Sequence, residues 1–135
     1  MTDLNQGVIG LPELADAHLA LARDNEHGRS AHLFLHDGPL RQSVIALVGG
    51  AELEEHNAPP AASLHVLSGR VRLLSEPGDA ELVSGQVMRI PQLRHGLMAL
   101  DDSVIVLTSV TATPEPVVVN DTRRGPGKGN DDTPL

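Results

Sequence analysis

The sequence contains almost no aromatic side chains and no cysteine. Phe34 is the single Phe, Tyr or Trp residue among 135 residues. Because proteins hold single-stranded nucleic acids by stacking bases on aromatic rings, this shortage argues against such a ligand. The absence of cysteine excludes disulfide bonds, thiolate metal ligands and cysteine nucleophiles. Any core must therefore be built from Leu, Val, Ile and Ala.

Positive charge is scarce, and long apolar runs are missing. The net charge is −8, with 10 Lys and Arg against 18 Asp and Glu. A nucleic-acid backbone needs a basic surface, so we expect no nucleic-acid partner. No apolar run approaches the roughly 20 residues of a membrane-spanning helix. The first residues also lack the basic start and apolar stretch of a secretion signal. We therefore expect a cytoplasmic protein with no membrane partner.

Length and composition predict one domain with loose ends. A chain of 135 residues with 40% hydrophobic residues can form one packed core without staples. After Thr113, Pro, Gly, Asn and charged residues dominate, and such a segment buries too little apolar surface to order itself. We predict an N-terminal segment over residues 1–29, a folded barrel over 30–113 and a disordered tail over 114–135.

The N-terminal segment contains the only stretch with a good helical pattern. Residues 12–23 begin with a proline, which suits the first helical turn. Apolar side chains then recur at three- and four-residue spacing, which predicts an amphipathic helix. The expected apolar stripe consists of Leu14, Ala17 or His18, and Leu21.

From residue 30 onward the pattern changes to short segments that alternate with turn signals. Gly, Pro, Asp and Ser pairs separate runs of four to eight residues rich in Val, Ile and Leu. So many short strands at even spacing are typical of an all-β sandwich or barrel. The predicted strands are residues 32–35, 41–48, 52–56, 63–67, 70–74, 80–83, 87–90, 96–99 and 103–110.

Three motifs occur in order within these strands. The first is a glycine, five residues and a histidine, from Gly50 to His56. The second is the hairpin sequence VLSGRV over residues 66–71. The third runs from Gly85 to Pro91, with His95 shortly after. Together they resemble the cupin superfamily, the RmlC-like double-stranded β-helix proteins, over roughly residues 40–110. The resemblance implies an all-β jelly-roll barrel with one short N-terminal helix outside it.

The resemblance also implies a metal site of which this chain keeps only part. His56 and His95 match two ligand positions, and two imidazoles in a barrel mouth suit Zn, Fe, Mn or Ni. The two other ligand positions of the family are Ala58 and Ala62 here. A catalytic metal normally takes three protein ligands, so the metal site is weak or absent.

Nearby side chains are candidates to complete the ligand set. We select Glu54, which is in phase with His56, and Gln42 on a neighbouring strand. His65 is not selected, because strand alternation places it on the face opposite to Leu64 and Val66. The expected binding pocket is lined by His56, His95, Glu54, Leu64, Val66, Leu97 and Ala99.

Three functions remain open at this point. The leading hypothesis is a cupin that binds a small molecule in its barrel, with His56 and His95 as polar anchors. The alternative is a metal-dependent enzyme, similar to the dioxygenases or isomerases of the superfamily, that uses the same two histidines. The third is a structural homodimer without a ligand. We expect a homodimer in each case, because Leu33 and Leu35, or Ile45 and Leu47, would otherwise form an exposed apolar face.

Overall fold

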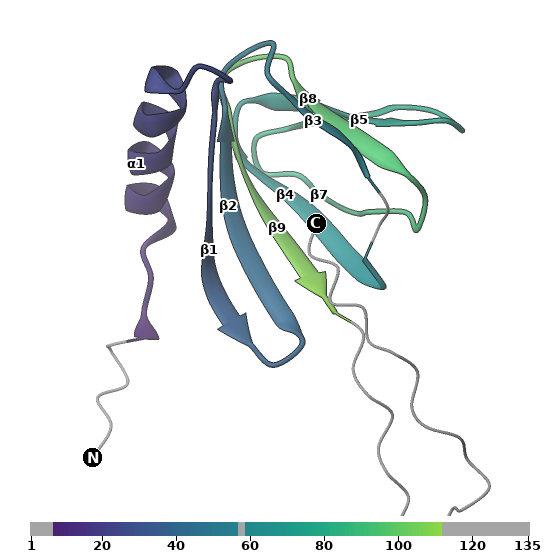
Figure 1. Cartoon of the computed structure of the whole chain (residues 1–135), viewed down its shortest axis with the longest axis horizontal. Coiled ribbons are helices and arrows are strands. Elements are labelled where there is room, and N and C mark those ends of the chain that lie inside the picture. The colour runs from purple at the N-terminus through teal and green to yellow at the C-terminus, as the bar shows by residue number, and fades with distance from the viewer. Residues whose placement is uncertain (1–6, 57–58, 112–135) are drawn as a thin grey trace, which may run out of the picture.

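The computed structural model describes residues 7–56 and 59–111 of the chain. This part forms one helix followed by nine strands (Figure 1). The predicted tail over 114–135 and the ligand position Ala58 lie outside the described residues. In the described part no helix has the length and apolar character that crossing a membrane requires. The elements are α1 (Leu11–Asp24), β1 (Arg29–Asp37), β2 (Leu40–Leu47), β3 (Glu52–His56), β4 (Ala61–Ser68), β5 (Arg70–Ser75), β6 (Ala80–Val83), β7 (Val87–Arg89), β8 (His95–Ala99) and β9 (Ser103–Val110).

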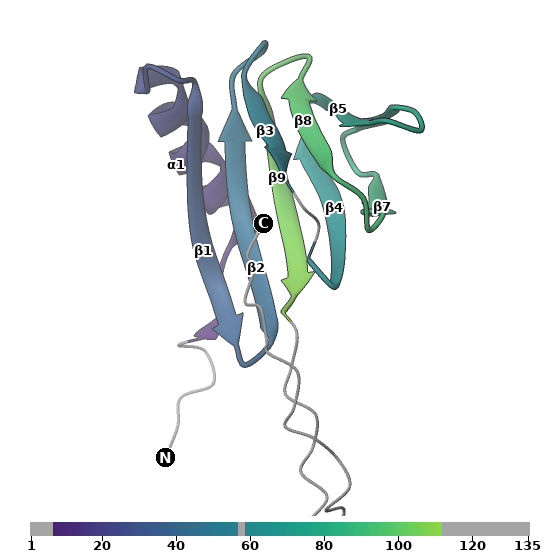
Figure 2. The same ribbon diagram turned by 45° about the vertical axis from the view of Figure 1, so that its right-hand side comes forward.

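The strands form two antiparallel sheets that face each other (Figure 2). The larger sheet has the order β1-β2-β9-β4-β7, and the smaller sheet has the order β3-β8-β5-β6. Strands distant in sequence are therefore neighbours, with β2 beside β9 and β3 beside β8. This is a jelly-roll arrangement, and it confirms the predicted all-β barrel with an N-terminal helix. Each predicted strand is present, with boundaries that differ mainly at β1.

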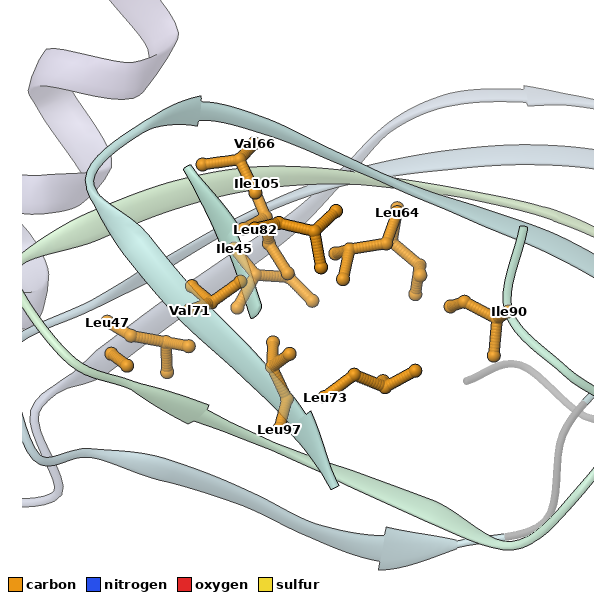
Figure 3. Packing of buried hydrophobic residues seen from close by; sticks show 12 residues of the cluster. Ile45, Leu47, Leu64, Val66, Val71, Leu73, Leu82, Ile90, Leu97 and Ile105 are labelled. Atoms are coloured by element: carbon orange, nitrogen blue, oxygen red, sulfur yellow. The ribbon is translucent and has the colours of Figure 1, made fainter. Parts of the chain in front are cut away.

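Aliphatic side chains from both sheets fill the space between them (Figure 3). Alternating inward-facing residues of β2, β4, β5, β8 and β9 belong to one cluster, as the strand pleat requires. Figure 3 shows Leu47 at one end of this cluster and Leu64 with Ile90 at the other. The buried members are Ile45, Leu47, Leu64, Val66, Val71, Leu73, Leu82, Ile90, Leu97, Ala99, Ile105 and Leu107.

Helix α1 covers the outer face of the larger sheet, over β1 and β2 (Figure 1). Leu14, Ala15, Leu19 and Ala22 pack against a second apolar cluster on that face. The predicted stripe was wrong at its C-terminal end, because Leu21 is 55% exposed. The helix turns by 100° per residue, so a stripe continued through positions 18, 19 and 22 leaves position 21 on the solvent side.

Strand β2 is covered on both faces, which corrects the expected outward apolar face. Ile45 and Leu47 point into the barrel and are 6% and 0% exposed. Val44 and Ala46 point the other way and are buried under α1. A strand that is covered on both faces has a continuous apolar sequence. The sequence of β2 therefore did not show which of its residues face the barrel interior. Leu33, which was the other candidate for an exposed apolar face together with Leu35, is exposed. The homodimer stays a prediction.

At the end of the barrel near Leu47, Gly69 and Ser103 close the structure. Gly69 has a φ of 92°, a left-handed conformation that side chains other than glycine rarely adopt. A Cβ at this position would collide with the Ser103 side chain and with the Asp102 backbone. Ser103 is fully buried, and its hydroxyl oxygen accepts a hydrogen bond from the Arg70 backbone N–H at 2.9 Å. The hairpin between β4 and β5 is thus fitted tightly against the start of β9.

Substitution of Gly69 tests this close fit against backbone strain alone. Gly85 has a φ of 87° but open space around its Cα, so it is a matched control. We expect Gly85→Ala to cost about 1–2 kcal/mol from the left-handed backbone. Gly69→Ala should cost a further 1–3 kcal/mol or so from overpacking. Equal free energies of unfolding for the two variants in urea would contradict the fit described for Gly69.

His18 on α1 contacts Ser30 and His32 on β1. His18 Nδ1 lies 2.7 Å from Ser30 Oγ, and the His18 ring stacks on His32 with centroids 5.6 Å apart. Burial lowers the pKa of His18, and the nearby positive charge that His32 can carry lowers it further. The folded state therefore favours the neutral form of His18 more than the unfolded state does.

This pKa shift predicts weaker folding in mild acid. Below the ordinary histidine pKa of about 6.5, the unfolded chain takes up a proton at position 18 that the folded chain resists. The free energy of unfolding should then fall as the pH drops from about 7.5 to about 5.5, and His18→Gln should reduce that fall. Urea titrations of both proteins at the two pH values measure it. An identical pH dependence in the variant would show that His18 does not contribute.

Candidate binding site

Both sheets change from aliphatic to polar on their inner faces at the same end of the barrel. Paired residues on neighbouring strands lie on the same face of a sheet, so each register row can be followed across the barrel. The row through Leu73 and Leu97 is aliphatic, and the row through Leu64 and Leu107 is aliphatic on β4 and β9 but has Ser43 on β2. The next row of each sheet contains hydroxyl, imidazole and guanidinium groups. We call these two polar rows the mouth of the barrel.

In the larger sheet the mouth row runs through Arg41, Ser109 and Ala62. Arg41 pairs with Ser109, and Ser109 pairs with Ala62. Ser109 is 4% exposed, which agrees with its inward position. Arg41 shares its face with Ser43 and with the core residue Ile45, because these positions differ by two along β2. The row thus places a hydroxyl beside the alanine that stands at a ligand position of the cupin pattern, and a positive charge one strand further on.

In the smaller sheet the mouth row runs through His56, His95 and Ser75. His56 pairs with His95, and His95 pairs with Ser75. Strand β3 has a register shift between Leu53, which pairs with Leu97, and His56. In a regular strand, position 56 would lie on the opposite face from Leu53, because the two are three residues apart. The extra residue in β3 compensates for this odd spacing, so position 56 returns to the inner face and pairs with His95. The described part of His56 is its backbone.

The two mouth rows lie at the same end because the chain links them directly. Residues 57–60 connect the end of β3 to the start of β4. After β7, Ile90 donates its N–H to the Ala62 carbonyl, and five residues later the chain reaches His95. Ile90 belongs to the same core cluster as Leu64. The mouth is therefore one region of the molecule.

His95 is the most completely buried polar group of the mouth. Its side chain is 2% exposed, and Nδ1 lies 2.9 Å from the Leu93 carbonyl oxygen. A carbonyl oxygen can only accept, so Nδ1 carries the proton and donates it. In the neutral ring Nε2 then holds the lone pair, and this nitrogen can accept a hydrogen bond or bind a metal. The backbone carbonyl thus sets both the tautomer and the orientation of the ring.

The other expected ligands occupy different places. Gln42 lies on the outer face of the larger sheet, where its Nε2 donates to Thr108 Oγ1 at 3.0 Å. It lines a hollow of about 340 Å³ on that face together with His65 and Val106. The strand pleat separates Gln42 from the barrel interior, which corrects its selection as a ligand. Glu54 has an exposed side chain, and the register shift in β3 removes the phase it was expected to share with His56.

The expected pocket residues lie below the mouth in the packed core. Leu64, Val66, Leu97 and Ala99 are between 0% and 5% exposed. They therefore form the floor of the barrel rather than an open wall. Two surface hollows flank the mouth above this floor. One, of about 470 Å³, includes Ala62 and Ile90 in its lining. The other, of about 460 Å³, includes Ser75 and Arg94.

The described side chains do not fit a catalytic metal centre. Among them no group of three His, Cys, Asp or Glu residues is close enough to hold an ion. The mouth offers His95, and position 56 opposite it, while position 62 carries an alanine. Two imidazoles are one ligand short of the three that a catalytic zinc or iron site uses.

Sequence reasoning missed Arg41 and Ser109 as mouth residues. The signal was present in β2, because positions 41, 43, 45 and 47 share a face once Ile45 is known to be inside. For Ser109 the signal required its pairing with Ala62, which joins residues far apart in the sequence.

Comparison with known proteins supports the fold. The sequence matches no protein-family model and no curated protein. Solved structures do match. A conserved protein of unknown function from Streptococcus pyogenes is 20% identical with a TM-score of 0.60, over 84% of this chain and 88% of that one. A cupin-2 domain protein from Shewanella frigidimarina is 16% identical with a TM-score of 0.61, over 80% of this chain and 99% of that one.

An enzyme is also among the similar structures. Salicylate 1,2-dioxygenase from Pseudaminobacter salicylatoxidans is 18% identical with a TM-score of 0.62. The match covers 73% of this chain and 33% of the dioxygenase, so this chain corresponds to about one third of that protein. At these identities the likeness establishes the cupin fold of the chain and leaves its activity open.

Restoring one carboxylate tests the geometry of the mouth. Ala62→Glu places a third potential ligand in the inner row, whereas Ala61→Glu places the same group on the exposed outer face. We expect purified Ala62→Glu to retain about one equivalent of Zn, Mn, Fe or Ni, and Ala61→Glu to retain no more than the unmodified protein. Elemental analysis without a histidine tag measures this. Equal retention by the two variants would show that position 62 does not face the two histidine positions.

Proposed function

We propose that this chain is a cupin-fold protein that binds a small molecule at the mouth of its barrel, with His95 as a polar anchor. The observation that carries the proposal is the buried imidazole at the boundary between the aliphatic core and the mouth. Burying a polar ring costs free energy unless it is hydrogen-bonded, and an aliphatic residue there would extend the core. A retained, oriented imidazole supports a role in recognition.

The chemistry of the mouth suits recognition of a partly apolar molecule. Nε2 of neutral His95 accepts a hydrogen bond, and the Ser109 hydroxyl can both donate and accept. The Ser75 hydroxyl donates to the Gly78 carbonyl oxygen and can still accept. The aliphatic floor through Leu64 and Leu97 provides apolar contact for the rest of the molecule. Small-molecule sites commonly combine such an apolar lining with a few directed polar groups.

Two other functions remain as alternatives with distinct outcomes. The first alternative is a metal-dependent enzyme that uses His56 and His95. The similarity to salicylate 1,2-dioxygenase makes a dioxygenase the reaction class to consider for it. The donor set, in which positions 56 and 95 are histidines and position 62 is an alanine, argues for the binding protein over the enzyme. A homodimer without any ligand is the third function.

Metal content separates the binding protein from the enzyme. We expect protein purified without chelator or histidine tag to contain far less than one equivalent of Zn, Fe, Mn or Ni. Elemental analysis of the wild type and of a His56→Ala, His95→Ala double variant provides the measurement. A stoichiometric metal in the wild type that disappears in the double variant would replace the proposal with the enzyme.

Ligand binding separates the binding protein from a purely structural dimer. A compound that prefers the folded state raises its melting temperature, so a library of small acids, amides and alcohols is screened by thermal shift. We expect at least one compound to bind, and His95→Gln to weaken it about tenfold, the worth of one buried hydrogen bond. The exposed His27→Gln is the control. No shift from any compound, with a dimer by light scattering, would favour the structural role.

A further inference from the structure

Arg41 differs from the other arginines that the structure describes on the two sheets. Arg70 and Arg72 lie on the outside of the smaller sheet, where both form salt bridges with Glu81. Arg29 donates to the Glu52 carbonyl oxygen at 2.9 Å. Arg41 instead points to the inner face at the mouth, in the row with Ser109. Among the described residues its side chain forms no ion pair, and its Nε has no hydrogen-bond partner.

Arg41 is partly buried, and burial of one of its donor atoms makes this absence of partners costly. Its Nε is buried and has no hydrogen-bond partner within the described structure. A donor on a charged group loses more by leaving water without a partner than a donor on a neutral group does. Buried donors are almost always paired in folded proteins, and the exceptions occur where a ligand or water completes them. We therefore expect a hydrogen-bond acceptor from outside the described chain to bind at Arg41 Nε.

The surroundings of Arg41 define which acceptor fits. Ser109 is its partner across β9, and His36 is its partner across β1. Neither side chain is a carboxylate, so neither neutralises the guanidinium. One row deeper the sheet has Ser43 on β2, and then Leu107 and Leu64 on β9 and β4. The site thus offers a guanidinium beside hydroxyl groups, with an apolar floor under the neighbouring strands.

We infer that Arg41 is the anion anchor of the mouth, and that the small molecule of the proposed function is an organic acid whose carboxylate pairs with the guanidinium. The inference rests on the proposed function and specifies its ligand. Arginine pairs with carboxylates through two parallel hydrogen bonds, which a planar carboxylate matches. The apolar floor holds the carbon skeleton. Because the whole chain carries a net charge of −8, the attraction for an acid comes from this local group rather than from the overall field.

Matched acid and amide probes test this inference. Benzoate and butyrate are titrated against benzamide and butyramide, which have the same shapes without the charge, and inorganic phosphate tests a non-carboxylate anion. Binding to the full chain is followed by thermal shift and by NMR chemical shifts. We expect the acids to bind more tightly than their amides, and phosphate to bind more weakly than benzoate because it has no apolar part.

Three variants assign the effect to Arg41. Arg41→Gln should weaken benzoate about tenfold to a hundredfold, as expected for loss of a charge-assisted pair. Arg41→Lys should recover part of that loss, because it keeps the charge without the fork. Arg72→Gln, on the outer face, should leave benzoate binding unchanged.

Stability provides a second readout that a merely structural arginine would not give. In the absence of any acid, Arg41→Met should melt at or above the temperature of the wild type, because it removes a buried donor that lacks a partner. A large drop in melting temperature for this variant would assign Arg41 to the fold and overturn the inference.

The outcomes separate this inference from the proposed function. If amides bind as tightly as acids, and binding depends on His95 but not on Arg41, the anion anchor is wrong while the binding protein stands. If no probe of any charge binds, the proposed function fails together with the inference. If phosphate outcompetes benzoate in an Arg41-dependent manner, the site recognises an inorganic or phosphorylated anion rather than a carboxylic acid.

Discussion

The pairing register between distant strands is the constraint on which the rest of this structure depends. Rows of paired residues run across β2, β9 and β4 in one sheet and across β3, β8 and β5 in the other. Because side chains alternate along a strand, the register decides which residues enter the core and which face solvent or α1. One extra residue in β3 is enough to change that assignment, and it brings position 56 into the row of His95.

The same register divides the barrel into a closed end and a mouth. At the closed end Gly69 lies against Ser103, and Asp102 accepts hydrogen bonds from the Gly49 backbone and the Arg23 side chain. These contacts lower the pKa of Asp102 and tie α1 to the turn between β8 and β9. At the mouth, polar side chains replace aliphatic ones although the position is sheltered. Close packing and backbone hydrogen bonds thus mark one end of the barrel, and inward-facing polar side chains mark the other.

Within the mouth, the two sheets contribute different chemistry. The smaller sheet supplies an imidazole whose tautomer is set by the Leu93 carbonyl, and the larger sheet supplies a guanidinium beside a hydroxyl. Of the metal-ligand positions in the cupin pattern, 56 and 95 are histidines, whereas 58 and 62 are alanines. Ala62 follows Ser109 in the inner row of the larger sheet, on the side away from Arg41.

The sequence by itself determined the strands, the turns and the fold. Glycine and proline punctuation set the strand boundaries, so that β3, β6 and β9 were predicted at their observed limits. Its motifs also pointed to His95, which the structure buries at an inward position, and alternation identified the outward position of His65. Only the tertiary structure decided that Gln42 faces outward, that β3 bulges before His56, and that Arg41 and Ser109 share the mouth. These facts depend on which strands pair and in which register, and long-range pairing leaves no local signal in the chain.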